Sequence, residues 1–112
     1  MIPLDRILIG SLLLLSMQAA TAADGQKIFT QGGENPSAMA CMSCHGPDGL
    51  GMAAAGFPRL AGLPAAYVSK QLKDFRDGSR KQPIMEPLAK ALSDAEISAI
   101  SATLAAMPVP PT

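Results

Sequence analysis

The two cysteines and the single histidine of this 112-residue chain lie together in one run, Cys41-Met42-Ser43-Cys44-His45. Two thiols three residues apart on one helical turn face the same way, so each can form a thioether to one edge of a flat macrocycle. The histidine that follows can then reach a central iron ion from one side. This C-x-x-C-H spacing is typical of covalent haem c attachment, with Cys41 and Cys44 as attachment points and His45 as an iron ligand.

Three other interpretations of the cluster remain open on the residues alone. A structural zinc site needs four ligands, and the chain has three cysteine and histidine residues in total, so a carboxylate would have to help. A thioredoxin-like redox pair would follow a strand in a βαβ unit, and no convincing strand is visible. A disulfide across three residues would close almost no loop entropy and would leave His45 without a role.

Residues 1–23 have the pattern of a secretory signal peptide. Arg6 and the free amine give a positive start, an apolar run extends from Ile7 to Met17, and small residues precede Asp24. The apolar run is shorter than the roughly 20 residues that span a bilayer as a helix. We therefore expect one mature domain, residues 24–112, exported to the periplasm. Membrane contact would come only through partners or through an uncleaved signal segment acting as an anchor.

The charge and size of the mature chain limit its partners. The nine basic and nine acidic side chains of the whole sequence become eight and eight once Arg6 and Asp5 are removed. Because there is no cationic excess and no basic stripe, nucleic acid is not an expected partner. A domain of roughly 90 residues has a hydrophobic core that barely exceeds the entropy it opposes, so a bound cofactor would add needed stability.

Glycine and proline divide the mature chain into short helices. Asp24 is a candidate N-cap for a first helix that runs through Phe29 and ends at Gly32-Gly33. Residues 33–64 are rich in glycine and proline and are expected to be mostly loop. A loop of this length in a small domain indicates that something other than the peptide organises it, such as a cofactor.

Two longer helices are expected in the second half of the chain. Pro64 suits the first position of one of them, whose apolar residues recur at helical spacing and which ends at Asp77-Gly78. Ser93-Asp94-Ala95-Glu96 is a capping box that begins the last helix, and Pro108 ends it. The expected apolar positions are Ala65, Val68, Leu72 and Phe75 in the first of these helices and Ile97, Ile100, Leu104 and Met107 in the last.

The chain resembles the class I c-type cytochromes, especially the small bacterial secreted ones, over essentially its whole mature length. The attachment run is followed by Gly46-Pro47-Asp48-Gly49, as is frequent in that family. Phe57-Pro58-Arg59-Leu60-Ala61-Gly62 is similar to the family segment in which a proline carbonyl accepts the ring N–H of the proximal histidine. The segment from Met85 to Ser93 is similar to the loop that carries the axial methionine. The resemblance implies an all-α, cytochrome c-like fold of three to four short helices around one covalently attached haem.

Pro58 also makes chemical sense without the family, because a bond to one imidazole nitrogen fixes the tautomer and turns the other nitrogen to the metal. The alternative is a proline that only fixes the backbone of its loop. For the sixth iron ligand, Met52, Met85 and Met107 are candidates outside the signal segment and the attachment region. Met52 lies in a glycine-rich loop, and Met107 lies on an apolar helix stripe where methionine usually fills the core.

We choose Met85, which lies between Pro83 and Pro87 in what we expect to be a stiff, non-helical stretch. Its alternative role is to pack on the haem edge without binding iron. The haem is expected to lie among Phe57, Leu60, Val68, Leu72 and Leu88.

Two further features leave their interpretation open. The charged residues between Lys70 and Lys81 suit a solvated helix face, or a positive patch that steers an acidic redox partner. Alternatively, Arg59, Arg80 or Lys81 offsets a haem propionate. The last helix also lacks the aromatic residue that many of these cytochromes pack against the first helix. We expect Phe29 to pack on the last helix nevertheless.

Histidine and methionine together would close both axial positions of the iron and raise its reduction potential. We therefore predict an electron-transfer protein, not an enzyme, that carries single electrons between respiratory or dehydrogenase partners outside the cytoplasm. The alternative is a haem subunit of a dehydrogenase complex, or a haem sensor or peroxidase with an open sixth position.

Overall fold

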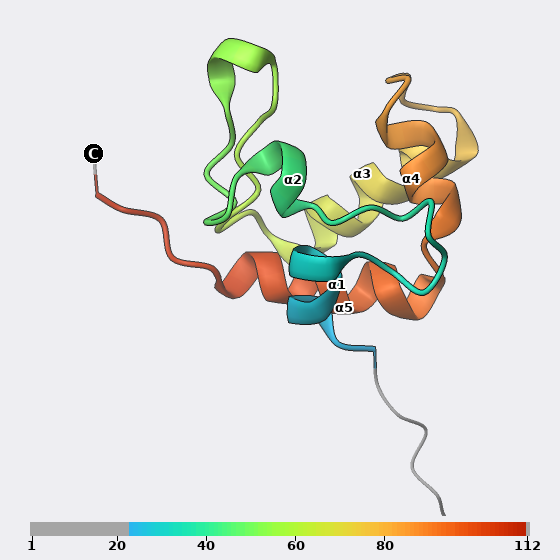
Figure 1. Cartoon of the computed structure of the whole chain (residues 1–112), viewed down its shortest axis with the longest axis horizontal. Coiled ribbons are helices and arrows are strands. Elements are labelled where there is room, and N and C mark those ends of the chain that lie inside the picture. Colours follow the sequence, from blue (N-terminus) through green and yellow to red (C-terminus); the bar gives the residue numbers. More distant parts are fainter. Residues whose placement is uncertain (1–22, 112) are drawn as a thin grey trace, which may run out of the picture.

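The computed structural model describes residues 23–111, so the predicted signal peptide lies outside the described residues apart from Ala23. Within this range the chain forms α1 (Gly25–Gln31), α2 (Met42–His45), the 3₁₀ helix η2 (Ala53–Ala55), α3 (Ala65–Asp77), α4 (Met85–Ala91) and α5 (Asp94–Ala106), as Figure 1 shows. Among residues 23–111 there is no strand, and one isolated bridge joins Met52 to Phe57. The all-α fold class is confirmed. No helix of this range combines the length and apolar character needed to cross a bilayer.

Helix α1 begins and ends where the sequence predicts. The Asp24 carboxylate accepts hydrogen bonds from the backbone amides of Gln26 and Lys27, at 3.0 and 3.2 Å. At the other end, the Gly32 amide donates to the carbonyl of Ile28 in a backbone conformation, φ +96°, that favours glycine.

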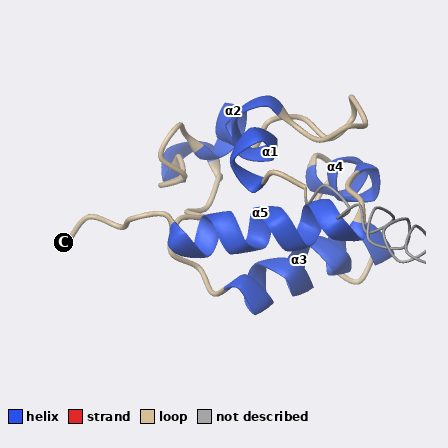
Figure 2. Ribbon diagram, turned by 90° about the horizontal axis from the view of Figure 1, so that it is seen from below, coloured by secondary structure: helices blue, strands red, loops and turns tan. Residues whose placement is uncertain are grey.

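The crossing of α1 and α5 forms the centre of the core. A Cβ atom on Gly25 would overlap the carbonyl oxygen of Ala99 and Oγ1 of Thr103, so glycine lets the two helices approach closely. Phe29 is 1% exposed and shares the buried cluster with Ile97 and Ile100. Figure 2 shows α5 lying between α1 and α3. Phe29 therefore packs in the core that α1 and α5 share, as predicted, without an aromatic partner.

The stretch around Met85 is helical, which corrects the prediction that it is not. Met85 is the first residue of α4, and Pro87 is the third. A proline in the first turn costs no hydrogen bond, because the first amides of a helix have no partner within it. The side-chain oxygen of Gln82 accepts from the amides of Ile84 and Met85, at 2.7 and 2.6 Å, and so caps the start of α4.

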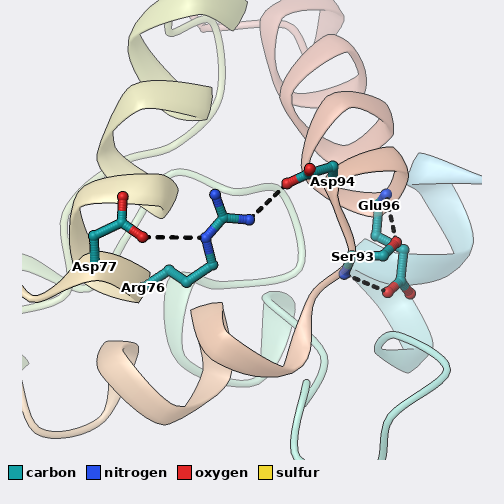
Figure 3. A network of polar contacts seen from close by, with 5 residues as sticks. All are labelled: Arg76, Asp77, Ser93, Asp94 and Glu96. Atoms are coloured by element: carbon teal, nitrogen blue, oxygen red, sulfur yellow. Dashed lines mark hydrogen bonds and ion pairs between the residues drawn. The ribbon is translucent and has the colours of Figure 1, made fainter.

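Polar contacts around the start of α5 tie it to two other segments. Ser93 and Glu96 form the predicted capping box, and the second carboxylate oxygen of Glu96 accepts from the amide of Glu34 at 2.9 Å. Arg76, in the last turn of α3, bonds Asp94 at 2.6 Å; Figure 3 shows this contact and the capping box. The buried Glu96 carboxylate therefore holds the loop after α1 against α5.

The hydrogen bonds to Glu96 predict acid-sensitive stability. Burial raises the pKa of Glu96. Hydrogen bonds with the amides of Ser93 and Glu34 and with the Ser93 hydroxyl lower it by more, so the pKa of Glu96 lies below its usual value. A carboxylate with a lowered folded pKa contributes stability above its unfolded pKa of about 4.3, and this contribution is lost as pH falls through the folded pKa. Glu96→Gln should cost about 1 kcal/mol at neutral pH and flatten the acid slope of the unfolding free energy.

Urea unfolding of the haem-loaded protein at a series of pH values measures both effects. Glu34→Gln is the matched control, since it makes the same change in charge at a residue that contributes its backbone amide to this contact. Equal acid slopes for wild type and Glu96→Gln would contradict the prediction.

Candidate haem site

A cavity of about 450 Å³ lies between the segment that contains α2 and helices α3 and α4. This volume is in the range of small-molecule and cofactor sites. All five residues predicted to surround the haem line the cavity: Phe57, Leu60, Val68, Leu72 and Leu88. Its floor is completed by core residues from α5, Ile100 and Leu104, so the cavity occupies the middle of the core.

The attachment run forms one wall of this cavity. Cys41 precedes the short helix α2 and His45 is its last residue, with the His45 amide bonded to the Cys41 carbonyl at 3.0 Å. Both cysteines line the cavity and neither is in a disulfide. Burial raises the pKa of the Cys41 thiol to about 11, against a smaller lowering by a backbone hydrogen bond. A thiol in such an apolar wall is suited to a thioether rather than to reactive thiolate chemistry.

The imidazole of His45 is held in one orientation. It is 7% exposed, and its Nδ1 lies 2.7 Å from the carbonyl oxygen of Pro58. Because a carbonyl oxygen can only accept, Nδ1 carries the proton and Nε2 is left as the nitrogen that can bind a metal. The hydrogen bond predicted between these two residues is therefore present in the structure, and Pro58 does more than fix its loop.

A glycine allows the Pro58 carbonyl to approach the edge of the histidine ring. Gly51 has φ +81°, and a Cβ there would lie 2.7 Å from the carbonyl oxygen of Phe57 and from the amide nitrogen of Arg59. The Gly51 amide also donates to the His45 carbonyl at 2.8 Å. The loop that carries η2 leaves from this point and projects away from the helices (Figure 1).

Met85 approaches the cavity from the α4 side. It is half-buried and lines the cavity, whereas Met52 and Met107, the other two candidates, do not. Met107 is not in the last helix as expected but caps its C-terminus after Ala106, and it packs against the edge of the core. The imidazole nitrogen of His45 and the thioether sulfur of Met85 are a donor pair that suits haem iron.

Several residues of the site were missed at the sequence level. Met39, Tyr67 and Ile84 line the cavity while remaining exposed, and Gln71 lines it from α3. None belongs to a short motif, and the first three would pass as ordinary surface or core residues. Gln82 also stands out only in the structure, because glutamine is not among the preferred capping residues.

An all-α domain around an apolar cavity, bordered by a C-x-x-C-H run, a carbonyl-supported histidine and a methionine, defines the class of single-haem c-type cytochromes. The sequence profile of the family named cytochrome c matches residues 22–107, and the chain belongs to this family. The predicted covalent haem c with its iron and the electron-transfer function follow from this membership.

The chain is also similar to individual proteins of known name or structure. The chain is 69% identical over 98 residues to a thiosulfate dehydrogenase electron acceptor of Stutzerimonas stutzeri strain A1501, covering 88% of this chain and 45% of that one. It superposes on reduced recombinant cytochrome c4 from Pseudomonas stutzeri with TM-score 0.72 and 41% identity, covering 78% and 48% of the two chains. It superposes on thiosulfate dehydrogenase (TsdBA) from Marichromatium purpuratum with TM-score 0.70 and 40% identity, covering 75% of this chain and 18% of that one. The chain thus spans less than half the length of each of these relatives.

Proposed function

We propose that this chain is a one-electron carrier of the periplasm in which Cys41 and Cys44 hold the haem and His45 and Met85 bind its iron. The observation that carries this proposal is that His45 and Met85 line the same cavity, with the His45 ring held in place by Pro58. Bound haem supplies a reversible one-electron change at iron. The protein orients His45, provides a sulfur ligand and surrounds the macrocycle with apolar side chains. With His45 and Met85 both bound to iron, no substrate would reach the metal, and the chain would act as a carrier rather than as an enzyme.

The electron donor that we propose is a dehydrogenase that oxidises thiosulfate. The relative at 69% identity is named an electron acceptor of such an enzyme. The signal peptide predicted in residues 1–23 would place the carrier on the side of the membrane where haem c proteins meet such partners.

The surface that meets the donor is the apolar rim of the cavity, formed by Met39, Tyr67 and Ile84. These side chains are 53, 49 and 44% exposed and all three line the cavity. Exposed apolar side chains grouped in one place mark interaction surfaces. A partner seated on this rim would lie next to the haem.

A change on the rim should slow electron uptake from the dehydrogenase. Ile84→Glu places an unpaired charge in the contact and should reduce the rate of haem reduction by thiosulfate and thiosulfate dehydrogenase about tenfold, or about 1.4 kcal/mol. The absorbance of the reduced haem, followed by stopped flow, measures this rate. Val109→Glu is the matched control, since Val109 is 42% exposed but does not line the cavity.

Two outcomes separate the parts of this proposal. Wild-type protein that is reduced by dithionite but stays oxidised with thiosulfate and the dehydrogenase would exclude this donor and leave the carrier function intact. Equal slowing by Ile84→Glu and Val109→Glu would exclude the rim as the contact.

A second candidate function is a fixed haem subunit of such a dehydrogenase. It is favoured by the superposition of this chain on 18% of a thiosulfate dehydrogenase chain. A fixed subunit would elute with the dehydrogenase in gel filtration at nanomolar concentration, whereas a carrier would elute separately.

A further inference from the structure

Arg80 is held beside the cavity by contacts to one face of α3. Its guanidinium donates to the side-chain oxygen of Gln71 at 2.9 Å, and its central carbon lies 4.5 Å from the centroid of the Phe75 ring. Its backbone amide donates to the carbonyl of Asp74 at 3.1 Å. Gln71, Phe75 and Arg80 all line the cavity. The side chain is therefore fixed in position although its end reaches solvent.

The charge of Arg80 has no counter-charge in the described part of the chain. Two of the three cations of α3 are paired, Lys70 with Asp74 and Arg76 with Asp77 and Asp94, and the third, Lys73, does not line the cavity. Within residues 23–111 no ion pair includes Arg80, whose side-chain contacts are a neutral amide and an aromatic ring. These contacts orient a guanidinium without neutralising it.

The cavity as a whole is positively charged. Among the described residues, Arg59 and Arg80 are its charged lining residues, and no carboxylate lines it. Haem c brings two propionate carboxylates into this site, and the planar fork of arginine matches a carboxylate with two parallel hydrogen bonds. Arg59 has no side-chain hydrogen bond in residues 23–111 that fixes its direction, whereas Arg80 is held by Gln71 and Phe75. Preorganisation favours Arg80, because less side-chain entropy is lost on binding.

We propose that Arg80 binds a haem propionate, that Gln71 and Phe75 position its guanidinium, and that its charge raises the reduction potential of the haem. This inference rests on the proposed function, because it requires haem in this cavity. Reduction adds one negative charge to the haem, so a fixed cation favours the reduced state. The same cation favours the ionised propionate, and removing it moves the ionisation of that propionate to higher pH.

The test is potentiometric titration of the haem-loaded protein over about pH 4 to 9, a range that contains the ionisation of carboxyl groups. Arg80→Gln should lower the equilibrium constant for reduction about tenfold near neutral pH, about 59 mV for one electron. It should also move the pH-dependent step of the potential to higher pH. Arg80→Lys keeps the charge without the fork, and Gln71→Leu keeps the charge without its orientation, so both should give smaller shifts.

Arg76→Gln is the matched control, because it removes the charge of a nearby arginine in the last turn of α3. Arg76 bonds Asp94 and does not line the cavity. The proposal is overturned if Arg80→Gln and Arg76→Gln have the same potential and the same pH step. It is also overturned if Arg80→Gln alters only the salt dependence of electron exchange, which would make Arg80 a residue that steers a partner. A normal reduced haem c spectrum with a retained sulfur-to-iron band would show that the carrier function stands in either case.

Discussion

Replacing both Cys41 and Cys44 by alanine should leave the chain without covalent haem and without cooperative tertiary structure. The cavity walls are also the core, because Leu72, Leu88 and Ile100 belong to both. An empty cavity costs about 24 cal/mol per Å³, so the cavity of about 450 Å³ would cost on the order of 10 kcal/mol if its walls did not move. The whole stability of a small domain is about 5 to 15 kcal/mol. The walls must collapse or the fold must open.

The double variant should retain part of its helical circular dichroism but show no cooperative thermal transition and poorly dispersed amide signals in NMR spectra. The single variant Cys41→Ala is the control, since it keeps one thioether and the histidine, and it should fold. A dispersed NMR spectrum from the haem-free double variant would contradict the view that the cofactor completes the core.

Most of the helices could be predicted from the sequence because capping residues and glycines, which act on their near neighbours, determine where those helices begin and end. Asp24 and the capping box at Ser93 begin α1 and α5, and Gly32 and Gly78 end α1 and α3. Helix α4 was missed because prolines on both sides of Met85 suggested a stiff loop. Whether Pro87 breaks a helix or starts one depends on the Gln82 side chain, whose direction no local pattern fixes.

Contacts between distant segments were beyond local reasoning. The bond from the Glu34 amide to Glu96 spans 62 positions and exists only because α1 crosses α5. The placement of Arg80 over Phe75 depends in the same way on how the loop after α3 folds back. The sequence left three roles open for this charged stretch, and the structure separates Arg80, which lines the cavity, from Lys81, which does not.

The five predicted site residues came from three kinds of signal in the sequence: spacing, elimination and resemblance to a family segment. Cys41, Cys44 and His45 lie within one run of five residues, and Pro58, 13 positions after the histidine, was predicted from the resemblance of its segment to that of the c-type cytochromes. Met85 was selected by excluding other methionines. All five line one cavity, which makes iron ligation by Met85 the next point to test.

Met85→Ala should open the sixth coordination position of the haem iron. The Met85 side chain projects from the first turn of α4, where the Gln82 side chain fixes its backbone, so alanine should leave the helix in place while removing the sulfur. Loss of a thioether ligand removes the preference for reduced iron that this ligand confers. The weak near-infrared sulfur-to-iron band should disappear, and the equilibrium constant for reduction should fall at least tenfold, about 59 mV for one electron. Reduced Met85→Ala protein should then bind carbon monoxide.

Met39→Ala provides the control, because Met39 also lines the cavity but lies two residues before the attachment run. This variant should keep the sulfur-to-iron band, a potential close to wild type and a reduced state that does not bind carbon monoxide. If wild-type protein itself lacks the band and binds carbon monoxide when reduced, its iron has an open position, and a haem sensor or peroxidase becomes the better account. Because only sulfur ligation produces the band, its loss in Met85→Ala and retention in Met39→Ala would assign the sixth ligand to one atom.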